Sequence, residues 1–223
     1  MVQFEAELAR VLPGDVPHRD ELIEKASRHL ALIASANEYM NLTRVVSPED
    51  AAIKHIYDSV APWRHFQGCE RILDAGTGAG FPGIPLAVVL PEARFTLCES
   101  TQKKARFVDL AVEALNLSNV RVTAQRAEEV SSQQRIDVIT ARALAPIGRI
   151  VTLFRKALKQ GTRLLLYKGP DAESELAEAR SSQVDATVLC RYDLPDGLGS
   201  RTMVELRASA LSAAHKRAQA SQV

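Results

Sequence analysis

The sequence predicts an α/β fold, with a mostly parallel seven-stranded sheet, an antiparallel edge strand and an N-terminal helical extension. Three observations predict this fold. Residues 1–66 carry apolar residues at helical spacing, residues from 71 onward alternate short apolar runs with helix-compatible stretches, and a turn-rich loop joins the last two runs. A chain of 223 residues with 46% hydrophobic content can bury a core around such a sheet.

The first 66 residues lack the alternating apolar pattern of strands, so we expect helices there. Residues 47–50, SPED, mark a helix start, because they supply a capping hydroxyl, a proline suited to the first helical position and an acidic residue three places after the cap. We expect that helix to continue through 51–63. The apolar face of the segment before it consists of Leu22, Ile23, Ala26, Leu30 and Ile33.

The predicted strands follow. Five apolar runs recur at intervals of roughly 20 to 30 residues with helix-compatible sequence between them, as parallel βαβ units require; they span 72–75, 94–98, 120–124, 136–141 and 163–167. Two further runs, 186–192 and 202–207, flank LPDGLG, a loop that can join antiparallel strands. We therefore divide the chain into a helical extension (1–66), a sheet domain (67–208) and a C-terminal tail (209–223).

Composition narrows the expected surroundings and partners. The N-terminus is acidic and amphipathic and no run approaches the roughly 18 apolar residues of a membrane helix, so we expect a cytoplasmic protein without membrane contact. Cys69, Cys98 and Cys190 lack CxxC or Cys/His ligand spacing, so neither a disulfide framework nor a metal site is predicted. The net charge of +1 gives no global indication of nucleic-acid binding.

A glycine-rich loop follows the first predicted strand, where residues 73–83 read LDAGTGAGFPG. Doubly wound folds bind nucleotides at this strand-to-helix turn, and glycine lets the backbone approach a ligand closely. Asp74 precedes a Gly-x-Gly-x-Gly spacing at Gly76, Gly78 and Gly80. This spacing resembles the methyltransferase form of the loop, in which the acidic residue and the loop meet the amino-acid end of S-adenosylmethionine. A turn without a ligand and an NAD-type site are the alternatives, although the dinucleotide pattern GxGxxG is not completed.

The next two predicted strands end in residues that suit the same cofactor. Glu99 comes 23 residues after Gly76, where a carboxylate can accept hydrogen bonds from both ribose hydroxyls. An ordinary role beside the start of the following helix is the alternative. After the third strand, Ala127 and Glu128 are placed to reach the adenine edge, with Ala127 packing and Glu128 polar.

Several motifs in order resemble one known family. They are Asn41-Leu42-Thr43, His55-x-x-Asp58-Ser59, the loop from Asp74 to Pro85, Arg142-Ala143 and Lys168-Gly169. Together they are similar to the glucose-inhibited division protein B family, also called RsmG, the small-subunit rRNA guanine-N7 methyltransferases. The resemblance covers about residues 20 to 207. It implies a class I (Rossmann-like) methyltransferase fold, S-adenosylmethionine as donor, and a guanine in the decoding-region loop of bacterial 16S rRNA as acceptor.

The resemblance also implies site residues. It places Gly76, Phe81, Ala127, Glu128 and Arg142 at the cofactor. The chain departs from the commoner pattern at Glu99, where aspartate is frequent, and at 202–207, which lacks a lysine-rich ending.

Three further side chains are candidates for substrate binding. Arg142 and Lys168 follow the fourth and fifth strands, where they are candidates for contacts with guanine O6, RNA phosphate or the cofactor carboxylate, or else are solvated cations. His55 and Asp58 lie about one turn apart on a predicted helix, and either close over the site or form a structural pair.

The chemistry of the expected target predicts a site without an essential catalytic acid or base. Guanine N7 has a free lone pair and no proton to remove, so methyl transfer to it needs positioning but no general base. The chain has TARALAP after the fourth strand rather than the (Asp/Asn)-Pro-Pro-(aromatic) motif of amine methyltransferases, and Cys98 lies within a strand rather than in a loop where a pyrimidine methyltransferase would need it. A small-molecule methyltransferase and a non-catalytic nucleotide-binding protein are the alternative functions.

Overall fold

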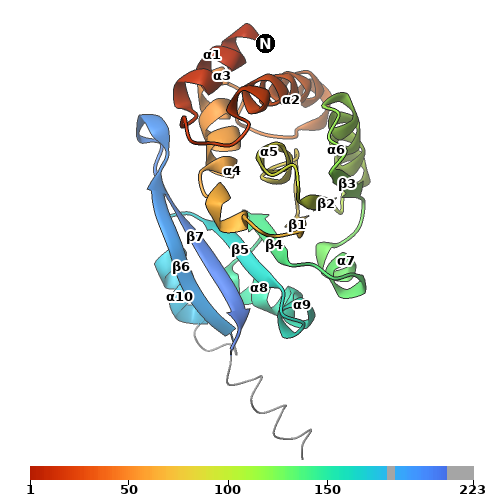
Figure 1. Ribbon diagram of the computed structural model, residues 1–223, viewed down its shortest axis with the longest axis vertical. Coiled ribbons are helices and arrows are strands. Elements are labelled where there is room, and N and C mark those ends of the chain that lie inside the picture. Colours follow the sequence, from red (N-terminus) through yellow and green to blue (C-terminus); the bar gives the residue numbers. More distant parts are fainter. Residues whose placement is uncertain (180–183, 210–223) are drawn as a thin grey trace, which may run out of the picture.

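The computed structural model describes residues 1–179 and 184–209, and in them seven strands form one sheet in the order β3-β2-β1-β4-β5-β7-β6 (Figure 1). The first five strands are parallel, whereas β7 runs antiparallel to both β5 and β6. The predicted parallel sheet with an antiparallel edge is therefore confirmed, and β7 lies between β5 and the outermost strand, β6. The strands are β1 (Arg71–Ala75), β2 (Arg94–Cys98), β3 (Val120–Thr123), β4 (Val138–Arg142), β5 (Arg163–Lys168), β6 (Val184–Asp193) and β7 (Ser200–Ala208).

The central strands are buried on both faces, which explains their continuous apolar sequence. Strand β4 is buried from Val138 to Ala141, and β5 from Leu164 to Lys168. By contrast, β6 alternates between exposed and partly buried residues, as expected of a strand with one face toward water.

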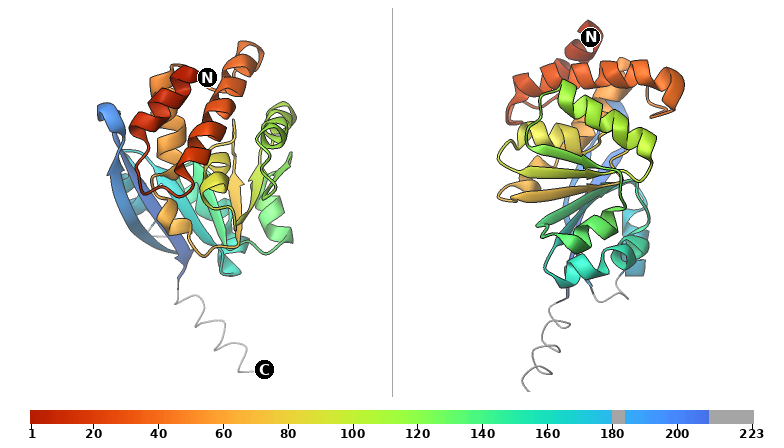
Figure 2. Two further views of the ribbon diagram at one scale, coloured as in Figure 1. Left: turned by 45° about the horizontal axis from the view of Figure 1, so that its top comes forward. Right: turned by 90° about the vertical axis from the view of Figure 1, so that its right-hand side faces the viewer.

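Helices cover both faces of the sheet (Figure 2), and each face has its own hydrophobic core. One core joins the N-terminal helices, α5 and α6 to the sheet, and the other joins α7 to α10. The α-helices are α1 (Val2–Val11), α2 (Arg19–Met40), α3 (Pro48–Ala51), α4 (Asp58–Val60), α5 (Gly83–Val89), α6 (Gln102–Ala114), α7 (Ala127–Gln133), α8 (Ile147–Leu153), α9 (Arg155–Lys159) and α10 (Ala172–Ala179). A π-helical turn, η1 (Ala52–Tyr57), joins α3 to α4, and η2 (Trp63–Phe66) and η3 (Pro195–Gly197) are 3₁₀ turns.

The N-terminal helices pack directly on the sheet domain. The predicted apolar face of α2 is buried at Leu22, Leu30 and Ile33 and contacts α5 and α6. The predicted helix start at 47–50 is confirmed, because Ser47 Oγ accepts a hydrogen bond from the Asp50 amide at 3.2 Å. This helix then widens into η1, the turn that carries His55.

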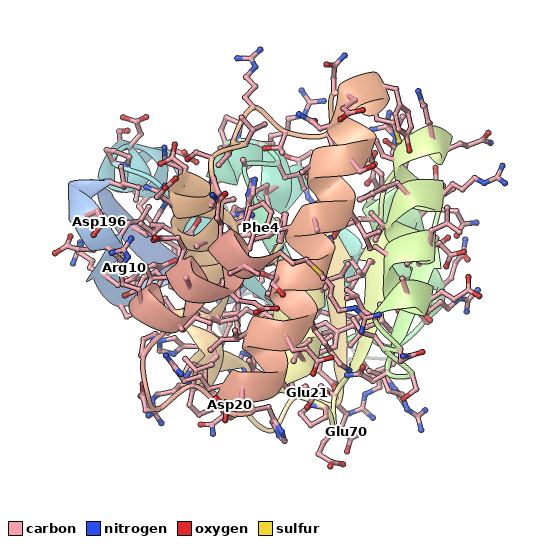
Figure 3. The ribbon with its side chains drawn as sticks, turned by 90° about the horizontal axis from the view of Figure 1, so that it is seen from above. Phe4, Arg10, Asp20, Glu21, Glu70 and Asp196 are labelled. Carbon is pink, nitrogen blue, oxygen red and sulfur yellow. The ribbon has the colours of Figure 1, made fainter. Side chains whose placement is uncertain are left out.

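The hairpin of β6 and β7 reaches back to the N-terminal helix. Arg10 on α1 donates hydrogen bonds to both carboxylate oxygens of Asp196 in η3, at 3.0 and 2.7 Å (Figure 3). The predicted C-terminal tail lies outside the described residues, apart from Ser209. In the described part of the chain, no helix is both long enough and apolar enough to cross a membrane.

Candidate active site

The glycine loop lies at the carboxyl end of β1 and is fixed by its own backbone. The amides of Gly76 and Thr77 both donate to the Cys98 carbonyl, at 2.9 and 3.0 Å, so the loop is tied to the end of β2. Gly76 and Gly78 have φ values of +71° and +61°. Only glycine adopts this left-handed region without strain, which accounts for these two residues in the motif.

A cavity of about 430 Å³ opens beside this loop. Loops that follow β1, β2, β3 and β4 line it, at the point where the strand order reverses between β1 and β4. Open α/β sheets bind ligands at this edge, and the volume is in the usual range for small-ligand sites. The cavity brings together three of the predicted cofactor residues, Gly76, Ala127 and Glu128; its other lining residues are Cys98, Ser100, Gln125, Arg126, Leu144, Ala145, Pro146, Arg149 and Leu153.

Asp74, in β1, holds the glycine loop in place through its carboxylate. Its Oδ2 accepts hydrogen bonds from Thr77 Oγ1 at 2.6 Å and from the Gly83 amide at 2.9 Å. Its Oδ1 is buried and has no hydrogen-bond partner among the described residues. Burial raises the pKa of Asp74 to about 6. An acceptor without a donor next to the glycine loop fits a ligand that carries N–H groups.

Glu99 follows β2, as predicted, and is 8% exposed. Its Oε1 accepts a hydrogen bond at 2.8 Å from the amide of Thr101, the residue before α6. One carboxylate oxygen therefore orders the start of the helix, so contact with a ribose stays a prediction for Glu99. The neighbouring Cys98 is buried, and burial raises its thiol pKa to about 12. A protonated, buried thiol is a poor nucleophile, which agrees with the sequence-based exclusion of cysteine catalysis.

The ring of Phe81 lies at the centre of a compact cluster. It stacks on the His55 ring, with centroids 4.6 Å apart and an interplanar angle of 5°, and its centroid lies 4.9 Å from that of His29. The Arg142 guanidinium carbon lies 5.6 Å from the same ring centroid. Because Phe81 is only 6% exposed, its ring serves as packing between α2, η1 and β4; contact with the cofactor stays a prediction.

Arg142 is held in place by the η1–α4 segment. Its Nη1 donates to the carbonyl of Lys54 at 3.0 Å and to Asp58 Oδ2 at 3.1 Å. The other oxygen of Asp58 accepts from the Tyr192 hydroxyl at 2.9 Å, and Arg201 Nε lies 3.5 Å from it. Asp58, the first residue of α4, thus links α4 to β4 and to the β6–β7 hairpin.

The structural His55–Asp58 pair that the sequence allowed is wrong. His55 Nε2 lies 3.0 Å from Thr43 Oγ1, and the described hydrogen bonds of Asp58 go to Arg142 and Tyr192. Each group has a partner from another segment; His55 lies in the π-helical turn η1, whereas Asp58 is the first residue of α4. Helical spacing alone could not reveal those partners.

Lys168, predicted to bind substrate, is buried in an ion pair. Its Nζ lies 2.7 Å from Glu175 Oε2 and donates to the Ala145 carbonyl at 2.9 Å, with the side chain 9% exposed. Glu175 also accepts from the amide of Ile147, at 2.8 Å. These bonds fix the loop between β4 and α8 that forms one wall of the cavity. Two of the three N–H groups of the Lys168 ammonium are therefore engaged within the protein, and a contact between Lys168 and RNA stays a prediction.

Sequence reasoning missed His29, on α2. Its Nε2 lies 2.9 Å from the Ala79 carbonyl, so it ties the N-terminal extension to the glycine loop, and its Nδ1 is buried without a partner among the described residues. Burial lowers the pKa of His29 to about 4. The pKa of His55 is lowered to about 3, by burial and then by Arg142. Both imidazoles are therefore neutral at neutral pH.

Acid should destabilise the folded protein through these two histidines. Between the ordinary pKa of 6.5 and about 4, the unfolded chain binds a proton at each histidine and the folded protein does not. The free energy of unfolding should then fall by up to about 1.4 kcal/mol per pH unit for each histidine. Asp74 acts in the opposite direction, because its raised pKa favours the folded state as the pH falls through about 6. The loss of unfolding free energy from the two histidines should exceed the gain from the one carboxyl group, so acid should destabilise the protein.

Urea denaturation at a series of pH values measures this effect. His29→Asn should remove about one proton from the pH dependence between pH 6.5 and about 4. His18→Asn, at a histidine whose side chain is 47% exposed, is the matched control and should follow the wild-type curve. A His29→Asn protein with the wild-type pH slope would show that His29 does not set the acid response.

Known proteins resemble this chain in sequence and in fold. The family model "GidB: rRNA small subunit methyltransferase G" matches residues 22–191. The protein named Ribosomal RNA small subunit methyltransferase G from Solibacter usitatus is 58% identical over 208 residues, which are 92% of this chain and 99% of that protein. A protein of the same name from Photobacterium profundum is 33% identical over 189 residues, covering 85% of this chain and 91% of that one.

Two solved structures support the fold. An O-methyltransferase from Bacillus cereus in complex with SAH has a TM-score of 0.55 and 22% identity, covering 81% of this chain and 91% of that one. The O-methyltransferase TomG from Streptomyces achromogenes, in complex with SAM, has a TM-score of 0.55 and 18% identity, covering 82% and 90%. At such identities the likeness concerns the fold alone, which is that of class I methyltransferases.

Proposed function

Because the chain belongs to the GidB family, the rRNA small subunit methyltransferase G proteins, we propose that it is an S-adenosylmethionine-dependent enzyme that methylates N7 of a guanine in bacterial 16S rRNA. The acceptor lies in the decoding-region loop of the small ribosomal subunit, and the enzyme acts in the cytoplasm. The observation that carries the proposal is the cavity beside the glycine loop, lined by Gly76, Ala127 and Glu128, in a chain of this family.

The residues at the cavity fit the cofactor. S-adenosylmethionine supplies a methyl group that its sulfonium sulfur makes electrophilic. Asp74 Oδ1, a buried acceptor without a donor in β1 directly before the glycine loop, would accept a hydrogen bond from the ammonium group if the loop admits it, and the positive φ values of Gly76 and Gly78 let the loop turn close to a ligand. Glu99 would accept hydrogen bonds from the ribose, and Ala127 and Glu128, which line the cavity, would contact the adenine.

The protein's own part in the reaction is to position the guanine and to keep the site rigid. No proton leaves guanine N7 on methylation, so the site needs no general base. His55 agrees with this expectation, because a pKa near 3, a contact with Thr43 and a stack on Phe81 make it a fixed neutral ring at neutral pH. Arg142, anchored by Asp58, places a cation at the same edge of the sheet. Such pre-positioning can supply much of a rate enhancement.

Transfer of a labelled methyl group tests the proposal directly. Purified protein would be incubated with methyl-labelled S-adenosylmethionine and small ribosomal subunits or 16S rRNA that lack the modification, and the RNA would be digested to nucleosides. We expect the label in 7-methylguanosine. A sample with the same RNA already methylated is the matched control and should take up no label.

The other outcomes separate the alternatives. Label in a different nucleoside would keep the cofactor and overturn the proposed target. Cofactor binding by calorimetry without RNA labelling would favour a small-molecule acceptor. An absence of both would favour a protein that does not act as a methyltransferase.

A further inference from the structure

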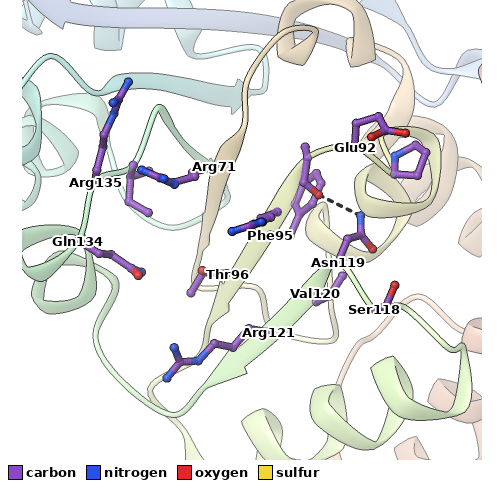
Figure 4. A pocket seen from close by; sticks show the side chains of 14 residues that line it. Arg71, Glu92, Phe95, Thr96, Ser118, Asn119, Val120, Arg121, Gln134 and Arg135 are labelled. Carbon is purple, nitrogen blue, oxygen red and sulfur yellow. Dashed lines mark hydrogen bonds between the residues drawn. The ribbon is translucent and has the colours of Figure 1, made fainter.

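A second concave surface lies at the amino-terminal ends of the strands, whereas the candidate active site lies at their carboxyl ends. It has a volume of about 570 Å³ and is lined at the amino-terminal ends of β1, β2, β3 and β4. We call it the arginine concavity, because four arginines line it: Arg71, Arg94, Arg121 and Arg135. Figure 4 labels three of them, Arg71, Arg121 and Arg135. The only acidic side chain in the described lining is Glu92.

The arginines of this surface are mostly unpaired. No ion pair joins Arg71, Arg94 or Arg121 to an acidic group among the described residues, and Arg135 lies 3.6 Å from Asp137 with its own side chain 79% exposed. At the next strand along the same edge, Arg163 behaves differently, because Glu205 lies 2.6 Å from its Nε. The chain carries 28 basic and 27 acidic residues overall. Four arginines with Glu92 in the lining and Asp137 beside Arg135 are therefore still a local excess of positive charge.

The register of the sheet brings positively charged side chains close together, which destabilises the fold unless a negatively charged partner binds there. Arg71 and Arg94 are directly paired positions on the neighbouring strands β1 and β2. Arg121 is paired with Thr96, two residues further along β2. Like charges on neighbouring strands repel one another and destabilise a sheet. An anion with regularly spaced charges would relieve that repulsion, and guanidinium groups bind phosphate through paired N–H donors.

We infer that the arginine concavity binds the phosphate backbone of the small-subunit RNA, at a segment away from the target guanine. This inference rests on the proposed function, which supplies an RNA partner. The concavity and the catalytic cavity lie at opposite ends of strands of four to five residues, β1 to β4. At about 3.3 Å per residue the strands alone separate the two sites by roughly 13 to 17 Å. An RNA that fills the arginine concavity and the catalytic cavity at once must span the length of the strands. This requirement favours a folded RNA over an isolated nucleotide, because a mononucleotide is too short to reach both sites.

The test replaces all four arginines with glutamine and measures methylation and binding of 16S rRNA. Each phosphate contact contributes about 0.7 to 0.9 to the slope of log affinity against log salt, so the slope should decrease in magnitude by about 3. The KM for 16S rRNA should rise at least about tenfold at physiological salt. The kcat and the affinity for S-adenosylmethionine should stay at the wild-type values, because the active site lies at the other edge.

A second variant controls for net charge. Arg106, Arg155, Lys156 and Lys159 are exposed on α6 and α9, and their replacement with glutamine removes the same four charges. An equal loss of RNA affinity in this control would overturn the inference in favour of a general charge effect. A wild-type salt slope in the first variant would also overturn it, as would weakened binding to assembled subunits with unchanged binding to bare 16S rRNA, which would indicate a protein partner. Failure of the wild-type protein to methylate RNA would instead overturn the proposed function.

Discussion

Gly76→Val should lower the affinity for S-adenosylmethionine by at least about 100-fold, which corresponds to about 2.7 kcal/mol. Two effects add at this position. Gly76 has a φ of +71°, a region that β-branched residues avoid, and a Cβ there would lie 2.8 Å from Leu144 Cδ1. Since Leu144 forms part of the cavity wall, the added side chain would press into the space beside the glycine loop. Titration calorimetry with S-adenosylmethionine measures the change.

A matched variant separates the ligand effect from backbone strain. Gly197, in η3, has a φ of +69° and no atom within 4 Å of a Cβ built on it. Gly197→Val therefore carries similar strain far from the cavity, and we expect it to bind the cofactor as the wild type does. Wild-type affinity in a folded Gly76→Val protein would contradict the assignment of the cavity to the cofactor.

The sequence predicted the sheet well because each strand leaves a local signal. Apolar runs, turn residues and glycines depend on their immediate neighbours, and a glycine at positive φ is required wherever the chain turns as it does at Gly76 and Gly78. The position of the glycine loop at the end of β1 then followed from the general rule for open α/β sheets. For the same reason the capped helix start at Ser47 could be predicted from a few adjacent residues.

Side-chain partners depend on contacts between distant segments, and the sequence did not reveal them. His29 resembles any other residue of an amphipathic helix, and its contact with Ala79 spans 50 positions. Lys168 was expected at the substrate because of its place at the carboxyl end of β5, but its ion-pair partner, Glu175, comes from α10. The arginine concavity was missed because its four residues are scattered through the sequence and meet only when parallel strands align their amino-terminal ends.

Because Asp58 joins segments that are distant in the sequence, its replacement should strongly lower the stability of the fold. Asp58→Asn should lower the free energy of unfolding by about 3 kcal/mol, because removing one partner of a buried ion pair leaves the other charge uncompensated. The side chains of Asp58 and Arg142 are 4% and 16% exposed, and Asn keeps the size of the carboxylate while removing its charge. Arg201, 3.5 Å from Asp58, would lose its counter-charge as well. Urea denaturation measures the loss, and the melting temperature should fall by roughly 2 to 4 °C per kcal/mol.

Asp196→Asn is the matched control for Asp58→Asn, because it removes the same charge from an exposed ion pair. Asp196 also pairs with an arginine, Arg10, at 2.7 Å, but the two side chains are 48% and 45% exposed. Water screens the attraction in such an exposed pair, so the stability of this variant should remain close to that of the wild type. If the two variants lost equal stability, burial would not govern the strength of the Asp58 link. If only Asp58→Asn were destabilised and its methylation rate also fell, the contacts of Asp58 would both hold the hairpin to α4 and fix Arg142 beside the active site.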